Sequence, residues 1–176
     1  MKVLLRSFDY LFIFLLFSCA NCFAQNKSGN FPTTNAQFKI PEPIGFVNDF
    51  ENLFTAPETK NLETMIMDFS SKTSIQVIII TIDTTLTDRD NFENFSMETY
   101  RSWELGSIEK FNGILISLSK KFRKIWLENG NGVRRVLSDH DINNFVANDF
   151  LPFLQEEKYY EATLNGMTAI MNKLKL

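Results

Sequence analysis

The hydrophobic residues of this chain recur with two different spacings, which separate the expected helices from the expected strands. After Thr55 the apolar positions are three and four residues apart, which predicts an amphipathic helix with one buried stripe. Thr55 followed three residues later by Glu58 forms a capping box that marks the start of this helix. The residues expected on its buried stripe are Leu62, Met65, Ile66 and Phe69.

Three further blocks have the composition of β-strands. Residues 75–82 are almost continuously apolar, which predicts a central strand buried on both faces, as in a parallel pair. Residues 114–119 and 124–128 are rich in β-forming side chains, and the basic tetrapeptide 120–123 between them suits the tip of a hairpin. A helix between the first two strands would make a right-handed crossover, which leaves these strands parallel. The hairpin adds an antiparallel strand, so the sheet should be mixed.

The length of the hairpin loop determines which residues face each other across the two strands. With a four-residue loop, Gly113 lies opposite Gly130. One step further from the loop, Asn112 lies opposite Asn131. Glycine permits close approach of the backbone, and amide carbonyls are oxygen ligands, so we expect a small polar cradle at this end of the sheet. The alternative is that these Asn-Gly pairs are only turns.

Three more helices follow from the same helical spacing. The first should be capped by Asp90, the second should start at Ser138 with Asp141 as its capping partner, and the third should follow Lys158. Pro152 should end or bend the second of them. Their inward positions are Phe92, Phe95, Tyr100 and Trp103, then Ile142, Phe145, Val146 and Phe150, and finally Tyr160, Leu164, Met167, Met171 and Leu174. The predicted fold is an α/β/α sandwich, with a small mixed β-sheet of three to four strands flanked by about four helices.

Residues 1–24 have the pattern of an export signal peptide. Two basic residues precede the apolar run 10–17, and residues 22–24 place small side chains at the two positions that a signal peptidase reads. The apolar run is too short for a membrane span, which needs ~20 residues. Cleavage before Gln25 would give a periplasmic or secreted protein. The alternative is a lipoprotein anchored at Cys19, because residues 16–19 resemble a bacterial lipobox.

The composition of the chain disfavours nucleic acid as a partner and excludes chemistry that depends on cysteine. Residues 25–43 are polar and contain prolines, so we expect a flexible tether before one domain that spans residues 44–176. Without Lys2, Arg6 and Asp9 of the leader, 18 basic and 21 acidic residues become 16 and 20, a net charge of −4 that disfavours nucleic acid. Both cysteines lie in the leader, which excludes thiol catalysis and cysteine-zinc sites from the mature chain. No second apolar run of transmembrane length follows in the mature chain.

The remaining side chains favour oxygen ligands. His140 is the one histidine, so a site that needs two imidazoles cannot form. Carboxylate and amide oxygens prefer hard cations, so Ca²⁺ is the expected ligand and Mg²⁺ the alternative. Two groups of donors compete for this role. One is the open end of the hairpin with Asn112 and Asp139, and the other is the acidic loop 83–90 after the first strand.

Four separated motifs resemble, in order and spacing, the TPM domain family. They are Trp-Glu-Leu-Gly at 103–106, Asn-Gly-Ile-Leu-Ile at 112–116, Gly-Asn-Gly at 130–132 and Leu-Ser-Asp at 137–139. The similarity runs from about Gly45 to the C-terminus. Calcium binding has been attributed to this family, so the resemblance implies metal ligands at its motif positions, which are Asp49, Asn112 and Asp139. The backbone cradle beside them would be formed by Gly113, Asn131 and Gly132.

The sequence departs from the family at two positions of the expected site. Phe111 stands where relatives commonly have Asp, and Arg134 stands where they have Glu, so two acidic groups are missing. Fewer negative charges weaken the binding of a divalent cation. The resemblance implies a calcium-binding module for the assembly or maintenance of envelope or membrane protein complexes, or a weak metal-assisted acid phosphatase. The departures support a third function, a metal-free protein-interaction domain. We expect a binding module more than an enzyme, because no general base stands out.

Overall fold

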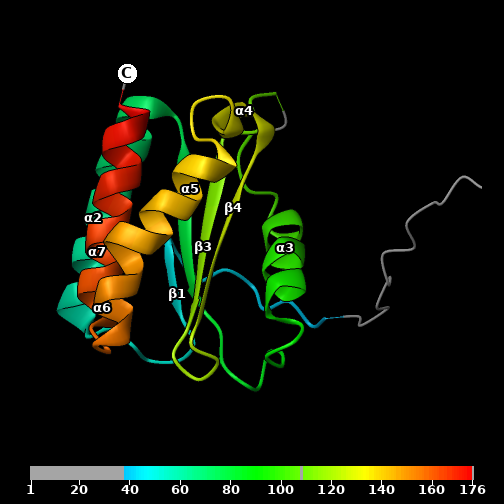
Figure 1. Cartoon of the computed structure of the whole chain (residues 1–176). Helices are drawn as coiled ribbons and strands as arrows, with labels where there is room; N and C mark the ends of the chain where they lie inside the picture. The colour runs from blue at the N-terminus through cyan, green and yellow to red at the C-terminus, as the bar shows by residue number, and fades with distance from the viewer. Residues whose placement is uncertain (1–37, 108, 176) are drawn as a thin grey trace, which may run out of the picture. The chain divides into compact units, whose positions relative to one another are not determined.

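A four-stranded mixed sheet forms the centre of the described part of the chain. The computed structural model describes residues 38–107 and 109–175. The strand order is β1-β2-β3-β4, with β1 (Val47–Asp49), β2 (Gln76–Thr81), β3 (Gly113–Ser119) and β4 (Lys124–Asn129) (Figure 1). The first three strands are parallel, and β4 is antiparallel to β3. The predicted mixed sheet of three to four strands is confirmed, with residues 47–49 supplying the fourth strand.

Helices cover both faces of this sheet, as the sandwich prediction requires. The first face is covered by α2 (Ala56–Thr73) and α7 (Tyr159–Leu174) together with α5 (Asp139–Phe145), η1 (Val146–Phe150) and α6 (Leu151–Gln155) (Figure 1). The second face is covered by α3 (Phe92–Ser102). Alternate residues of β2 enter the two cores: Ile79 packs in the first and Ile80 in the second, and both are fully buried. The predicted stripes are confirmed, with Leu62, Ile66, Phe92 and Phe95 all 0 % exposed.

The β3–β4 hairpin has the predicted four-residue loop. Ser119 pairs with Lys124, which leaves residues 120–123 at the tip. The carboxylate of Glu51 accepts the main-chain N–H groups of Lys120 and Lys121 at 2.7 and 3.1 Å. These bonds hold the basic loop against the segment that follows β1.

Two of the three predicted helix caps are confirmed. The Glu58 carboxylate accepts the main-chain N–H of Thr55 at 2.7 Å at the start of α2. Ser138 and Asp141 form the capping box of α5, and hydrogen bonds from Ser138, joined by one from Lys173, lower the pKa of Asp141 to about 2. The prediction for Asp90 was wrong. Asn91 is the residue before α3, and neighbouring Asp88 accepts its main-chain N–H at 2.9 Å.

Pro152 bends a continuous helical segment. Proline lacks the N–H that would close an α-helical hydrogen bond with the residue four positions earlier. The chain passes from α5 through five residues of π-helix, η1, into α6, which starts one residue before Pro152. Phe150, at the end of η1, is fully buried against the first face of the sheet.

The residues before β1 pack on the second face. Phe38 meets Phe95 edge to face with 5.5 Å between ring centroids, and the Trp103 indole donates to the Pro41 carbonyl at 2.8 Å. The structure thus places the last residues of the predicted tether against the domain. The predicted signal peptide, Cys19 and residues 25–37 lie outside the described residues. In the described part, no helix combines the length and the apolar character needed to cross a membrane.

Candidate functional site

The open end of the β3–β4 hairpin brings together the residues predicted to form the cradle. The Gly130 N–H donates to the Gly113 carbonyl at 3.0 Å, and the Gly132 N–H donates to the Phe111 carbonyl at the same distance. The predicted opposition of Gly113 and Gly130 is therefore confirmed. Asn131 begins a short helix, α4 (Asn131–Arg134), where the sequence suggested only a loop.

Close backbone approach, and not turn geometry, explains the two glycines of this end. The φ angle of Gly130 is −70°, an ordinary value for any residue. A Cβ atom on Gly130 would overlap the Phe111 carbonyl oxygen, and one on Gly132 would overlap the Lys110 carbonyl oxygen. The backbone of α4 therefore lies directly on the loop before β3. The cradle exists, but its carbonyls are engaged in holding the two segments together.

Asn112 joins the loops at this end through both polar groups of its side chain. Its carbonyl oxygen accepts the Ser107 N–H at 2.9 Å, and its amide group donates to the Ser74 carbonyl at the end of α2. Both functional groups of the side chain therefore have protein partners. A ligand role for Asn112 would have to use the second lone pair of an oxygen that already accepts the Ser107 N–H.

Asp49 lies at the other end of the sheet. It pairs with Thr81 in register, and Thr81 in turn pairs with Leu118, whereas Gly113 begins the same β3 strand. Five residues of strand separate the two ends, about 17 Å at ~3.3 Å per residue. The Asp49 carboxylate accepts the Thr81 hydroxyl at 2.7 Å and the Phe54 N–H at 2.8 Å. The structure thus does not bring Asp49 to the cradle.

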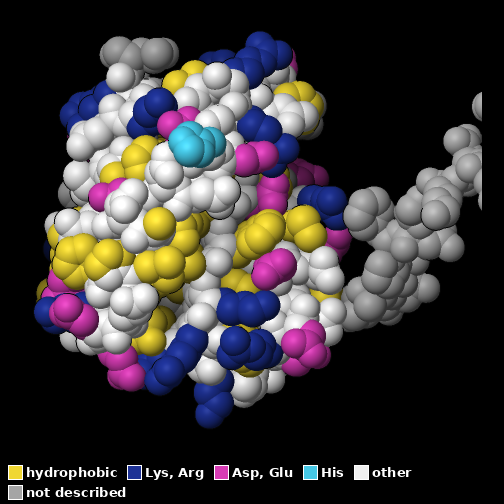
Figure 2. All heavy atoms as spheres, in the orientation of Figure 1, with side chains coloured by type: hydrophobic (Ala, Val, Ile, Leu, Met, Phe, Trp, Pro, Cys, Tyr) yellow, Lys and Arg dark blue, Asp and Glu magenta, His cyan; other side chains and the backbone are white. Residues whose placement is uncertain are grey.

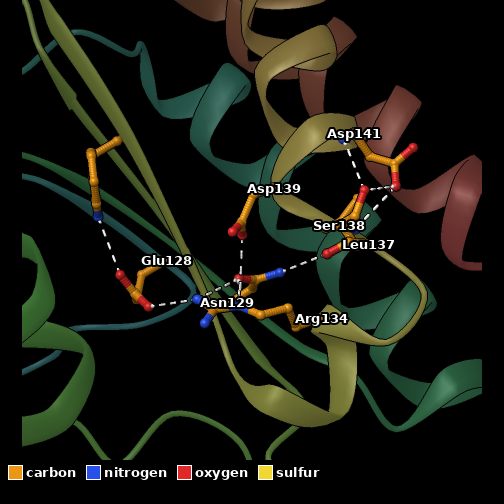
Figure 3. Close-up of polar contacts among 8 residues, drawn as sticks. Glu128, Asn129, Arg134, Leu137, Ser138, Asp139 and Asp141 are labelled. Carbon is orange, nitrogen blue, oxygen red and sulfur yellow. Dashed lines mark hydrogen bonds and ion pairs between the residues drawn. The ribbon is translucent and has the colours of Figure 1, made fainter.

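Arg134 lies at the centre of the polar contacts near the cradle. Its guanidinium reaches the Asn129 side-chain oxygen at 3.4 Å, a Glu128 oxygen at 3.6 Å and an Asp139 oxygen at 3.7 Å. Figure 3 shows these three side chains pointing toward Arg134 from β4 and from the start of α5. Asn129 is 3 % exposed, and its amide group donates to the Leu137 carbonyl at 3.1 Å. The protein supplies its own cation to this group of oxygens.

From the sequence, Arg134 is a departure from the family pattern that replaces an acid by a cation, and its contacts are not predicted. Arg134 follows Asn129 by five residues, and the short helix α4 between them turns its side chain back toward the end of β4. Recognising this helix in the sequence would have placed Arg134 near Asn129. Asp139 follows five residues later, at the first position of α5, and its side chain is 79 % exposed. Arg134 and Asp139 are thus brought together with Glu128, a residue that the sequence did not single out.

A hollow of about 300 Å³ opens beside this group. Its walls come from α3, the loop before β3, the end of β4 and α4, and they are Met97, Tyr100, Arg101, Phe111, Glu128, Asn129, Gly130, Asn131 and Arg134. Burial raises the pKa of Tyr100, the negative charge of Glu128 adds to this effect, and Arg134 opposes it. The phenol therefore stays protonated at neutral pH and is suited to donate a hydrogen bond, not to attack as a nucleophile.

The carboxylates of the described residues are not gathered into one cluster. Nowhere in residues 38–107 and 109–175 do three or more His, Asp or Glu side chains converge. In the competing loop 83–90, Asp83 accepts the N–H and hydroxyl of Thr85, and Asp88 accepts the N–H groups before α3. These carboxylates cap local turns. His140 is exposed, and its ring contacts Asn144 at 3.1 Å.

Comparisons with known proteins agree with the motifs. A protein-family model described as the TPM domain matches residues 47–173. No curated protein gave a match.

Three structures solved by NMR have a similar fold. An N-terminal domain of a protein from P. gingivalis is 20 % identical, with a TM-score of 0.66 over 73 % of this chain and 81 % of that one. The BA42 protein of the psychrophilic bacterium Bizionia argentinensis is 18 % identical, with a TM-score of 0.61 over 71 % and 83 %. The N-terminal domain of the cg2496 protein from Corynebacterium glutamicum is 15 % identical, with a TM-score of 0.56 over 75 % and 82 %.

Proposed function

The chain belongs to the TPM domain family, and from this premise we propose that it is a protein-interaction module in which Arg134 takes the place of a bound metal ion. Its partners would be proteins of the bacterial envelope or membrane, in the periplasm or outside the cell. The observation that carries the proposal is the position of the Arg134 guanidinium between Asn129, Glu128 and Asp139. A fixed positive charge there repels a divalent cation and occupies the oxygens that would bind it.

The contacts of Arg134 matter more for ligand choice than for stability. Its side chain is 47 % exposed, and ion pairs at exposed positions contribute only ~0–1 kcal/mol. The charge nevertheless stays within 4 Å of both carboxylates. Removing Arg134 would leave Glu128 and Asp139 beside the Asn129 carbonyl, a set of oxygens that suits Ca²⁺. Calcium binding by this end of the hairpin is therefore the alternative function, and it requires Arg134 to move away.

The phosphatase alternative has weaker support in the geometry. Metal-assisted hydrolysis of a phosphate ester needs open coordination positions and a group that activates water. In the hollow beside Arg134, the raised pKa of Tyr100 keeps its hydroxyl protonated, and Glu128 is paired with the guanidinium. Neither residue is set up as a general base. An interaction surface needs only the shape and the charges that are present.

A calcium titration followed by amide NMR tests the metal-free proposal. Addition of about 10 mM Ca²⁺, well above the ~1 mM dissociation constant of weak extracellular sites, should leave the amides of residues 112–113 and 128–139 unshifted. The same result is expected with Mg²⁺. The amides of loop 83–90 serve as the internal control, because exposed carboxylates there would report weak non-specific binding. Saturable shifts at residues 129–139 would restore the calcium-binding function, and saturable shifts confined to residues 83–90 would move the metal site there.

A further inference from the structure

The free edge of β4 and the hollow beside the hairpin tip form a second surface, distinct from the Arg134 group. We propose that this surface binds an extended peptide segment in which an apolar residue is flanked by acidic residues. The proposal deepens the proposed interaction function by naming the surface and the chemistry of the partner. It rests on three observations, which concern the backbone of β4, the shape of the hollow and the charge around it.

The backbone of β4 has an unpaired side. β4 pairs with β3 and ends the sheet on that side. The bond from Gly130 to Gly113 sets the alternation of the antiparallel ladder, so the N–H and C=O groups of Ile125 and Leu127 point away from β3. Among the described residues, no backbone bond joins these groups to another element. Such an edge is a template for adding an extended strand.

A hollow of about 220 Å³ lies next to this edge, between the hairpin tip and α6. Its apolar walls are Ile125 of β4, Leu151 and Leu154 of α6, and Tyr159 of α7. Leu151 is 37 % exposed, so part of this apolar wall is open to a ligand. The volume is smaller than the ~300–1,000 Å³ of sites for drug-sized ligands, and it suits one large apolar side chain of a peptide.

Two basic residues, Arg123 and Lys124, line the hollow together with the acidic Glu157. Lys120, Lys121, Arg123 and Lys124 lie at and beside the tip, and Figure 2 shows basic side chains gathered at the lower end of the molecule next to hydrophobic ones. Lys120 pairs with Glu157 at 3.3 Å, and Lys124 pairs with Glu93 at 3.4 Å. Within the described residues, the Lys121 ammonium and the Arg123 guanidinium form no ion pair, although the Lys121 main-chain N–H donates to Glu51. These two charges select an acidic partner.

A second copy of the chain is a poorer match than an acidic peptide. Two β4 strands could pair across a two-fold axis at Trp126, which would set Lys124 opposite Glu128 of the other copy. The same register sets Arg123 opposite Asn129, an uncharged residue, and leaves the hollow unfilled. The unmatched charge of Arg123 and the unfilled hollow therefore favour the acidic peptide, and self-association becomes an outcome of the test.

The test uses the full chain and two synthetic peptides. The first has a central leucine flanked by valines and then by Asp and Glu, and the second replaces each acid by lysine. The acidic peptide should shift the amides of residues 123–127, slow hydrogen exchange at Ile125 and Leu127, and bind more weakly as salt increases. The basic peptide should not bind. Shifts confined to the Arg134 end, binding independent of charge, or absence of binding would each overturn the proposal.

Variants at the tip connect binding to the two free charges. Arg123→Glu and Lys121→Glu should each weaken the acidic peptide by about fivefold to tenfold through charge repulsion. The exposed Lys60 lies on α2, so Lys60→Glu is the matched control and should leave affinity unchanged. Arg123 has a φ of 53°, so Lys121→Glu is the safer variant if Arg123→Glu perturbs the loop.

Protection of Ile125 that grows with protein concentration alone would show a dimer and overturn the peptide proposal. Neither failure would bear on the calcium titration.

Discussion

Replacing Ile79 with alanine should lower the free energy of unfolding by ~2–5 kcal/mol, the usual cost of removing a large aliphatic side chain from a core. Ile79 is 0 % exposed in the middle of β2, and it pairs with Val47 of β1 and Ile116 of β3. The surrounding strands cannot collapse into the cavity without losing their hydrogen bonds. Urea unfolding followed by circular dichroism would measure the change through the shift of the transition midpoint.

Ile44 provides the matched control for this substitution. It has the same side chain, but it is 78 % exposed before β1. Ile44→Ala should change the free energy of unfolding by no more than ~0.5 kcal/mol, as is usual for surface positions. Equal effects at Ile44 and Ile79 would show that β2 is not the central strand. A loss below ~1 kcal/mol at Ile79 would contradict the tight packing of this core.

Replacing Gly132 with alanine should destabilise the fold by ~1–3 kcal/mol, the range for overpacking a well-packed region. The new Cβ atom would overlap the main-chain carbonyl oxygen of Lys110, which cannot rotate away as a side chain can. The helix α4 would have to move, and it carries Arg134. Thermal or urea unfolding would measure the loss, and NMR shifts of Glu128 and Asp139 would report the displacement of the guanidinium.

Whether Gly132→Ala lowers or raises the free energy of unfolding shows why glycine is needed at this position. A decrease indicates close contact with the Lys110 carbonyl, and an increase indicates an ordinary helix position. In a helix without the close contact, glycine to alanine usually stabilises by ~0.4–1 kcal/mol. Asn131 is the preceding residue of α4 and is exposed, so Asn131→Ala should stay within ~0.5 kcal/mol of the wild type. A stabilised Gly132→Ala variant would contradict the contact between α4 and the loop before β3.

Local rules of sequence predicted most of the fold. The apolar run 75–82 and the spacing of Leu62, Ile66 and Phe69 identified a central strand and a packed helix, because burial enforces those periods. The four-residue basic loop predicted the pairing of Gly113 with Gly130, because strand register is counted from the turn. The TPM resemblance was confirmed over residues 47–173.

The candidate site could be predicted only in part, because its chemistry depends on contacts between distant segments. Asp49 lies on a family motif. The parallel pairing of β1 with β2 nevertheless places it at one end of the sheet, while Asn112 lies at the other end. Asn112 is predicted as a ligand through its side-chain oxygen, and that oxygen already accepts the Ser107 N–H. Arg134 departs from the family pattern at the level of sequence. The short helix α4 places its guanidinium next to the side-chain oxygens of Glu128, Asn129 and Asp139.

Whether Arg134 takes the place of a metal ion is tested most directly by the melting temperature of Arg134→Glu with and without calcium. Arg135→Glu, at the exposed neighbouring position, is the matched control. A site with a dissociation constant of ~1 mM would add about 1.4 kcal/mol of stability at about 10 mM Ca²⁺, a rise of several degrees. We predict that only Arg134→Glu melts at a higher temperature in Ca²⁺ than in EDTA, because it adds a carboxylate beside Glu128 and Asp139. A wild-type protein whose melting temperature rises with calcium concentration would contradict this role of Arg134.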